Sequence, residues 1–320
     1  MSKLAFLFPG QGSQYAGMGK ELAARYAVAG AVFEEADAVL EWPRKLSGLC
    51  FEGPDEELKL TANTQPAILA VSVAAARVLE EKGVQPDYGA GHSLGEYSAL
   101  VTAGALSLRD ALATVQNRGR YMQEAVPAGQ GAMAALLGLA HEKVESVCRQ
   151  AAQGQVVAPA NLNSPEQIVI AGNTAAVERA VRLATAAGAK RAVLLPVSAP
   201  FHCALLEPAA ERLAADLARI TFRALRFPVV NNVDAEVVRT GAAARDALRR
   251  QVTAPVRWEE SIRKLIALGC TRFIEVGPGK VLRGLLRQID RAAVGYNVED
   301  EESLQTTLER LTATTREAAS

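Results

Sequence analysis

Cysteine is scarce in this chain of 320 residues, and its four thiols lie far apart in the sequence. Cys50, Cys148, Cys203 and Cys270 form no C-x-x-C pair, and no histidine stands at the spacing of a metal site. Scattered cysteines of this kind are typical of reduced thiols in a cytosol. We therefore expect neither disulfides nor a metal site, and we predict a cytoplasmic protein.

The chain also lacks net charge and long apolar runs. Its 35 basic residues balance 35 acidic ones, so no overall field favours nucleic acid or an anionic membrane as a partner. Pro9 and Gly10 directly follow the apolar run at residues 4–8, so this run is too short to be the core of a signal peptide. No later apolar run is long enough to cross a bilayer. With 49% hydrophobic residues, the chain can bury a large core, so we predict a soluble globular protein.

Strand and helix patterns alternate along the chain, which is the signature of an α/β fold. A short buried strand at residues 3–8 precedes one helix expected over residues 18–40. A second helix is expected over residues 65–83, with Pro66 in its first turn and Gly83 as its C-cap.

Residues 127–198 show a different order: a strand, a helix, two strands, a helix and a strand. This β-α-β-β-α-β order is that of a ferredoxin-like unit. We therefore predict a small ferredoxin-like subdomain at residues 127–198, inserted into a larger α/β-hydrolase-like body with a parallel sheet, formed by residues 1–126 and 199–320. A ligand cleft is expected between the two.

The segment DYGAGHSLGEYSAL, residues 87–100, places Ser93 between Gly91 and Gly95. Glycines two before and two after a serine let a strand turn sharply into a helix, so that the serine projects outward as a nucleophile. The start of the helix that follows would aim backbone N–H groups at Ser93. An ordinary glycine turn fits the same five residues, and the pattern alone leaves both interpretations open.

A serine nucleophile needs a base, and the sequence has only three histidines. His92 adjoins Ser93 and is expected to pack or hydrogen-bond locally, while His141 begins a helix of the insert and is expected in solvent. His202 lies on a loop where the larger body resumes, the position of a base that faces the cleft, although a structural histidine fits there too. Its neighbour Cys203 has no glycine elbow and is predicted to be a buried spectator thiol.

Arg118 borders the apolar face of a helix whose expected start is the capping box Ser107–Asp110. Such an arginine either extends its guanidinium to water or meets an anion, because an unpaired buried charge is costly. Helix geometry alone favours the exposed guanidinium. If Ser93 is reactive, a planar bidentate cation nearby instead implies a substrate that carries a carboxylate.

Seven ordered blocks in this chain resemble the malonyl-coenzyme A to acyl carrier protein transacylases of fatty acid synthesis. The resemblance covers nearly the whole chain. The blocks are FPGQGSQYAGMG at 8–19, GHSLGEYSAL at 91–100, RGRYMQEAV at 118–126, NLNSPEQIVIAG at 161–172, VSAPFH at 197–202, QVTAPVRW at 251–258 and EVGPGKVL at 275–282.

The resemblance implies a ping-pong transfer in which Ser93, activated by His202, takes malonyl from malonyl-coenzyme A and passes it to the phosphopantetheine thiol of acyl carrier protein. It implies that the backbone amides of Gln11 and Leu94 stabilise the oxyanion, and that Arg118 holds the malonyl carboxylate. No cofactor is implied beyond these substrates, and we expect a monomer.

Other site residues follow from the same resemblance. The family orients its histidine through main-chain carbonyls near Gln251, so we assign no aspartate to a triad. Phe201 is implied to crowd the substrate α-carbon and to favour malonyl over branched extenders. Met122 and Asn161 lie in blocks that line the pocket, although core packing would explain both.

Partner and phosphate sites are less marked. Acyl carrier proteins are acidic, so the basic pairs Lys190–Arg191 and Arg283–Arg287 could attract one, although the pattern favours ordinary solvated faces for both pairs. The GPGK segment at residues 277–280 lacks P-loop spacing, and we interpret it as a structural turn.

Three alternative functions fit the same sequence features. An acyltransferase that serves a polyketide synthase would share the chemistry and differ in its carrier. A serine esterase or thioesterase would share the elbow, but an acid before the histidine and an HGGG-type oxyanion loop are not evident. A non-catalytic scaffold that binds the carrier would form no acyl-serine.

Overall fold

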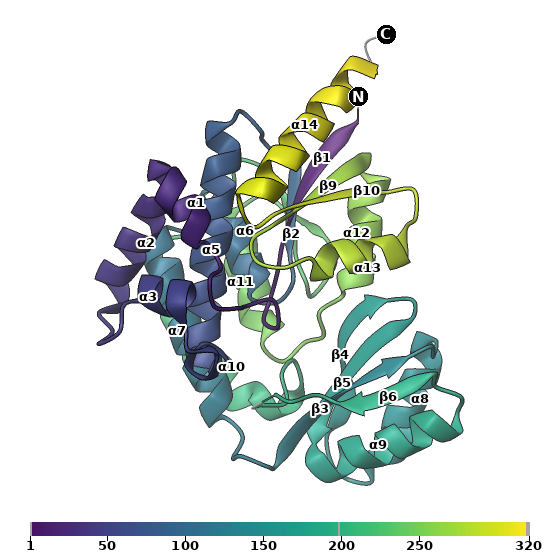
Figure 1. Ribbon diagram of the computed structural model, residues 1–320. Helices are drawn as coiled ribbons and strands as arrows, with labels where there is room; N and C mark the ends of the chain where they lie inside the picture. The colour runs from purple at the N-terminus through teal and green to yellow at the C-terminus, as the bar shows by residue number, and fades with distance from the viewer. Residues whose placement is uncertain (1, 198, 318–320) are drawn as a thin grey trace.

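The computed structural model describes residues 2–197 and 199–317. Two separate sheets organise it, one with the strand order β10-β9-β1-β2-β7-β8 and the other with the order β4-β5-β3-β6 (Figure 1). The strands of the larger sheet are β1 (Lys3–Phe8), β2 (Tyr88–Gly91), β7 (Val229–Val230), β8 (Val237–Val238), β9 (Cys270–Val276) and β10 (Val294–Val298). This mixed α/β architecture confirms the predicted fold class.

Strand β1 lies inside the larger sheet, where it pairs in parallel with β2 on one side and β9 on the other. Its residues after Lys3 are all buried, as expected for a parallel strand covered on both faces. Strands β7 and β8 pair antiparallel, so the parallel sheet has one antiparallel edge. Strand β7 is short and comprises only Val229–Val230.

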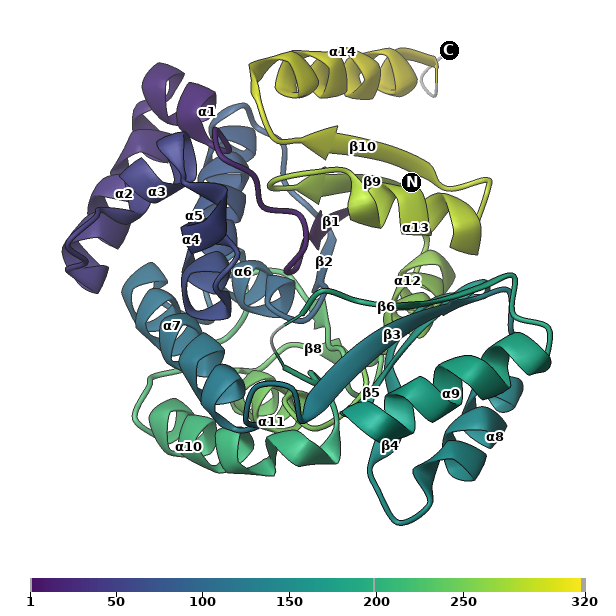
Figure 2. The same ribbon diagram turned by 60° about the horizontal axis from the view of Figure 1, so that its bottom comes forward.

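Helices cover both faces of this sheet (Figures 1 and 2). They are α1 (Lys20–Arg25), α2 (Ala27–Leu40), α3 (Leu46–Glu52), α4 (Asp55–Leu58), α5 (Thr61–Glu81), α6 (Gly95–Thr102), α7 (Leu108–Glu124), α10 (Glu207–Ala218), α11 (Gly241–Gln251), α12 (Trp258–Ala267), α13 (Val281–Ile289) and α14 (Glu301–Glu317), with a 3₁₀ turn at Ala204–Leu206.

Two helix boundaries differ from the sequence-based expectation. The single helix expected over residues 18–40 is broken at Tyr26, whose backbone is extended and which separates α1 from α2. Helix α5 begins at Thr61, so Pro66 is its sixth residue and not part of its first turn. Burial of α5 on nearly all sides explains why the helix tolerates this proline, because tertiary packing overrides local propensity. Gly83, with φ of 77°, follows the helix end as predicted.

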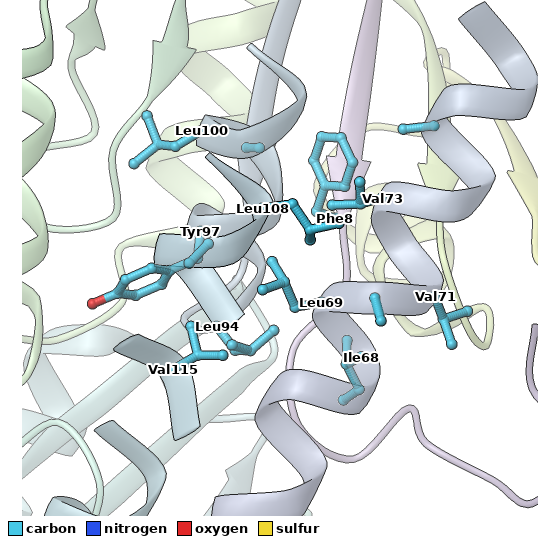
Figure 3. Close-up of a cluster of buried hydrophobic side chains, with 14 of the residues drawn as sticks. Phe8, Ile68, Leu69, Val71, Val73, Leu94, Tyr97, Leu100, Leu108 and Val115 are labelled. Atoms are coloured by element: carbon cyan, nitrogen blue, oxygen red, sulfur yellow. The ribbon is translucent and has the colours of Figure 1, made fainter. Parts of the chain in front are cut away.

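The core of the body lies between α5, α6 and α7. Figure 3 shows Leu69 of α5 close to Leu94 and Tyr97 at the start of α6, and to Leu108 and Val115 of α7. All five side chains are buried. This packing holds the first turn of α6, and therefore the residues just before it, against the rest of the body.

The smaller sheet is formed by one continuous segment. Its elements are β3 (Gly131–Leu137), α8 (His141–Ala152), β4 (Val157–Ser164), β5 (Gln167–Asn173), α9 (Thr174–Ala186) and β6 (Arg191–Leu194). All its pairings are antiparallel, and α8 and α9 pack on one face of it (Figure 2). The β-α-β-β-α-β order and the ferredoxin-like strand arrangement are confirmed. The domain limits at 127 and 198 stay predictions, and residue 198 lies outside the described residues.

A direct backbone contact joins strand β4 of the smaller sheet to the larger body. Val256 donates its backbone N–H to Ala160 at 2.8 Å and accepts the N–H of Leu162 at 2.9 Å, forming a bridge beside Asn161 of β4. This bridge holds β4 against the larger body. Within residues 2–197 and 199–317, no helix combines the length and the apolar character needed to cross a bilayer.

Candidate active site

Ser93 lies on a sharp turn between β2 and α6. Its φ is 52°, in the left-handed region that is unusual for a residue with a side chain. A Cβ added at Gly91 would lie 1.9 Å from the carbonyl carbon of Gly95, and one at Gly95 would lie 2.0 Å from the carbonyl oxygen of Phe8. Both glycines are therefore required by close backbone contact, and the turn is the strand–turn–helix elbow that the sequence predicts.

His202 is brought to the same point from the loop after the smaller sheet. Its Nε2 lies 2.7 Å from the Oγ of Ser93, and its Nδ1 lies 2.9 Å from the backbone carbonyl oxygen of Gln251. A carbonyl only accepts, so Nδ1 carries the proton and Nε2 is left to accept from the serine hydroxyl. Burial, helped by the nearby Arg118 charge, lowers the pKa of His202 to about 3. The imidazole is therefore neutral at physiological pH, as a general base must be.

Arg118 does not extend to water, because only 2% of the residue is exposed. Its Nη1 donates to Oε1 of Gln65 at 2.7 Å, and its Nη2 donates to Oε1 of Gln251 at 2.9 Å and to Oγ of Ser93 at 3.0 Å. The guanidinium also stacks over the ring of Tyr97, 5.6 Å from its centroid. These acceptors are neutral oxygens, so the buried cation is placed to take an anionic substrate group beside Ser93.

A cavity of about 430 Å³ surrounds these three residues, lined from the body and from the segment of the smaller sheet. The predicted cleft is therefore present. Eight of the nine site residues singled out in the sequence line it: Gln11, Ser93, Leu94, Arg118, Met122, Asn161, Phe201 and His202. The ninth, Gln251, lies beneath it and is fully buried.

The cavity-lining residues have different surroundings. Leu94 immediately precedes α6, where the first N–H groups of a helix have no partner within it. The side chain of Gln11 donates to Oγ1 of Thr61 at 3.2 Å. Met122 is buried and accepts a long contact of 3.8 Å from Nε2 of Gln65. The buried Oδ1 of Asn161 has no hydrogen-bond partner among the described residues.

Gln251 holds the serine turn from below. Its Nε2 donates to the carbonyl oxygen of Ser93 at 3.0 Å and to Oε2 of Glu96 at 2.8 Å. Its Oε1 accepts from Arg118, and its backbone carbonyl accepts from His202. One buried residue therefore contacts the serine, the histidine and the arginine, which is a wider role than the orientation of His202 alone.

Asn232, Glu96 and Gln65 were missed by sequence reasoning. Asn232 follows β7, accepts the N–H of Ser93 at 2.7 Å and donates to the carbonyl oxygen of Gly91 at 2.7 Å. A signal for it was present, because polar residues directly after the apolar run at 227–230 mark the carboxyl end of a parallel strand, where ligand sites form. Gln65 carried no comparable signal.

The other reactive side chains have structural roles. His92 packs and hydrogen-bonds as expected, but with partners that are distant in the sequence: its Nε2 lies 2.8 Å from Oδ1 of Asn163 and its ring lies 5.5 Å from that of Trp258. His141 is half-exposed and 3.7 Å from Glu145. Cys203 is buried, and burial raises the pKa of its thiol to about 11, which fits a spectator.

The GPGK segment is occupied by a carboxylate of the chain itself. The N–H of Gly279 donates to Oε2 of Glu299 at 2.8 Å, and Nζ of Lys280 lies 3.2 Å from the same carboxyl group. At the start of α13, Glu275 accepts the N–H groups of Leu282 and Arg283. These carboxyl groups take the donors that a phosphate would need, so the segment is a structural turn.

Acyl transfer is the chemistry that such a cleft supports, because a serine beside a neutral histidine can carry an acyl group between two thiols. The fold and the site thus define an acyltransferase. In agreement, the family described as "Acyl transferase domain" matches residues 5–308. The chain belongs to this family and, within it, to the malonyl CoA-acyl carrier protein transacylases.

Relatives and solved structures carry this assignment. The malonyl CoA-acyl carrier protein transacylase of Bacillus subtilis (strain 168) is 52% identical over 312 residues, which span 97% of this chain and 98% of the relative. An acyl carrier protein S-malonyltransferase from Vibrio cholerae superposes with a TM-score of 0.93 at 51% identity, over 96% of this chain and all of that chain. A solved structure of a type II PKS acyl-carrier protein in complex with its malonyl-transacylase matches with a TM-score of 0.94 at 49% identity, over 97% of this chain and 100% of the matched chain.

Proposed function

We propose that this chain transfers malonyl from malonyl-coenzyme A to the phosphopantetheine thiol of acyl carrier protein, supplying fatty acid synthesis. The observation that carries this proposal is the convergence of a nucleophile, a neutral base and a buried cation within one cavity. The Nη2 of Arg118 lies 3.0 Å from Oγ of Ser93, which itself lies 2.7 Å from Nε2 of His202. This combination suits an acyl thioester with a carboxylate at its far end.

In the first half-reaction, Ser93 Oγ attacks the thioester carbonyl while its proton passes to Nε2 of His202. The tetrahedral intermediate collapses with cleavage of the C–S bond, and His202 returns the proton to the leaving coenzyme A thiolate. The backbone N–H groups of Gln11 and Leu94 are the proposed oxyanion donors, each worth about 3 kcal/mol of barrier. The product is a malonyl ester of Ser93.

In the second half-reaction, the thiol of the carrier's phosphopantetheine arm gives its proton to His202 and its sulfur attacks the ester carbon. The ester C–O bond breaks, and the proton returns to Oγ of Ser93. Gln251 keeps the required tautomer in both halves, because its carbonyl accepts from Nδ1 of His202. No group other than the two substrates is consumed.

Arg118 is the proposed basis for the preference for a diacid. A malonyl carboxylate can pair with the buried guanidinium, whereas an acetyl group leaves it with neutral partners only. Phe201 also lines the cavity, directly before His202, and is proposed to restrict branching at the substrate α-carbon. Met122 and Asn161 are proposed as lining residues of the same pocket.

A carrier from polyketide synthesis remains the second candidate for the acceptor. The solved complex of a similar malonyl-transacylase contains a type II PKS acyl-carrier protein, and it covers 97% of this chain. The two candidates share every chemical step above and differ only in the acceptor. The predicted monomer and the cytoplasmic location stay predictions.

The first test is covalent trapping. Wild-type protein incubated with malonyl-coenzyme A, without a carrier, should gain one malonyl group by intact-mass analysis, and peptide mapping should place the adduct on Ser93. The Ser93→Ala variant is the control and should gain none. Addition of holo acyl carrier protein should then remove the adduct and malonylate the carrier, whereas release of free malonate would indicate a hydrolase.

The same assay tests Arg118. Because a charge-assisted hydrogen bond contributes about 1.5–3 kcal/mol, Arg118→Met should reduce the preference for malonyl- over acetyl-coenzyme A by roughly 10- to 100-fold. The measurement is the ratio of kcat/KM for loading of the two thioesters. An unchanged ratio would show that Arg118 does not determine the preference for malonyl-coenzyme A.

A further inference from the structure

Glu96 is a buried carboxyl group directly beneath the reacting residues. It lies in the first turn of α6, only 1% of it is exposed, and it does not line the cavity. Its Oε2 accepts the backbone N–H of Asn232 at 3.0 Å and Nε2 of Gln251 at 2.8 Å. It takes no part in the acyl transfer steps proposed for Ser93 and His202.

The amide of Gln251 connects this carboxyl group to Arg118. Because Nε2 of Gln251 donates to Glu96 and to the backbone of Ser93, its Oε1 faces the guanidinium of Arg118. Carboxyl group, amide and guanidinium therefore form a chain in which the amide dipole favours a negative charge at one end and a positive charge at the other. In the ligand-free site, the side chain of Gln251 therefore links the carboxyl group of Glu96 to the guanidinium of Arg118.

Other charged and titratable groups among the described residues also act on Glu96. Arg118 of α7 favours its ionised form, while Asp234, in the turn between β7 and β8, disfavours it. Asp234 is itself held by two hydrogen bonds from Arg250, at 2.8 and 2.7 Å. Tyr97, the next residue of α6, also faces the Glu96 charge.

We propose that Glu96 exchanges a proton with solvent as the substrate carboxylate arrives: it balances Arg118 as a carboxylate in the empty site and becomes neutral when malonyl pairs with Arg118. This inference rests on the proposed function. The only bond formed is O–H, with a proton taken from solvent. Glu96 acts through Gln251 and Arg118 and is a positioning residue that does not touch the substrate.

The physical reason is the cost of two buried carboxylates around one cation. When malonyl occupies the guanidinium, Glu96 loses much of the favourable charge that keeps it ionised and gains a like charge nearby, so its pKa rises further. Burial already raises the pKa of Glu96 to about 7 in the free protein. A further rise therefore changes its protonation at neutral pH, and malonyl binding is coupled to proton uptake.

Calorimetry measures this uptake directly. Malonyl-coenzyme A is titrated into the Ser93→Ala protein at pH 7.5 in two buffers of different ionisation enthalpy, so that binding is followed without acyl transfer. Acetyl-coenzyme A, which has the same phosphates, is the ligand control. We expect malonyl-coenzyme A to take up about three quarters of a proton more than acetyl-coenzyme A, as linkage predicts for a group whose pKa moves from near 7 to well above the working pH.

The Glu96→Gln change, added to the Ser93→Ala protein, is the matched control. It keeps the shape and one accepting oxygen but cannot ionise, so the excess uptake should vanish. Equal uptake for both thioesters in the Ser93→Ala protein alone would overturn the proposal, whether or not the glutamine variant folds. Failure of the proposed function would look different, because wild-type protein would then form no malonyl adduct at Ser93.

Kinetics give a second readout. In the wild-type protein, KM for malonyl-coenzyme A should rise between pH 7 and 9, by up to about tenfold per pH unit. The reason is that malonyl binding requires a protonated Glu96, and the protonated fraction falls as the pH rises. In the single variant Glu96→Gln this rise should be lost. A role in folding alone would lower kcat or stability and leave the slope of KM against pH unchanged, which would contradict the proposal.

Discussion

At the scale of single residues, the site depends on how firmly Ser93 is held. A non-glycine residue with φ of 52° costs on the order of 1–3 kcal/mol, and it persists only when its surroundings determine it. Here the N–H of Ser93 donates to Asn232 and its carbonyl oxygen accepts from Gln251. The side-chain amides of Asn232 and Gln251 thus compensate the backbone strain, and the hydroxyl group of Ser93 stays available to His202.

The protonation state of His202 gives a prediction on pH. With a pKa of about 3, the imidazole stays unprotonated through the range where an ordinary histidine, near 6.5, would become charged. We expect kcat/KM for malonyl loading to show no decline from pH 7 down to about pH 5. A fall centred near pH 6.5 in stopped-flow loading would contradict the assignment.

Stability sets the lower limit of that measurement. Between about pH 3 and 6.5 the unfolded chain binds a proton at His202 that the folded chain does not, so the free energy of unfolding falls as pH is lowered through this window. Circular dichroism at each pH is therefore the control that the protein is still folded.

At the scale of elements, the elbow between β2 and α6 depends on close backbone approach. Gly95 packs against the carbonyl oxygen of Phe8 at the end of β1, so β1 and α6 meet with no room for a side chain. Helix α6 is in turn packed against α5 and α7 (Figure 3). Strand, turn and helix thus position Ser93 as one rigid unit.

Two glycine substitutions test this dependence. Gly95→Ala places a Cβ against backbone that cannot move aside, so we expect a loss of about 3 kcal/mol or more in the free energy of unfolding, together with loss of Ser93 acylation. Gly284→Ala in α13 meets no atom within 4 Å and should raise stability by up to about 1 kcal/mol. Urea unfolding measures the free energy of unfolding of both variants. Equal changes in this free energy would contradict the packing argument.

At the scale of the whole molecule, the carrier must reach a site between two sheets. A hollow of about 210 Å³ shares Gln11, His92 and Asn161 with the main cavity and reaches Val281 at the start of α13. Further along α13, Arg283 and Arg287 line a second hollow with other basic side chains. The pair Lys190–Arg191 is less suited, because Lys190 is 3.3 Å from Glu166.

We therefore predict that α13 receives the acidic carrier. Arg287→Glu should raise the KM for acyl carrier protein several-fold and weaken its dependence on salt, while malonyl loading stays unchanged. Arg245→Glu is the matched control, because Arg245 is an exposed arginine of α11, which lies apart from α13 in both views (Figures 1 and 2). An equal effect of both changes would show that only net charge matters.

The sequence by itself determined several elements and the identity of the central residues. Strand β1, the β-α-β-β-α-β order of the smaller sheet and the elbow at Ser93 are each encoded in consecutive residues, through apolar periodicity or glycines at fixed spacing. The seven blocks pointed to Ser93, His202 and Arg118 together.

Only the tertiary structure decided how these residues act. Helix periodicity favoured an exposed Arg118, whereas packing buries it against Gln65 and Gln251, which are 53 and 133 positions away in the chain. The support of Ser93 by Asn232 likewise spans 139 positions. Local patterns reflect neighbours along the chain, but burial and hydrogen-bond partners arise when distant segments meet, and in this site those partners set charge, tautomer and orientation.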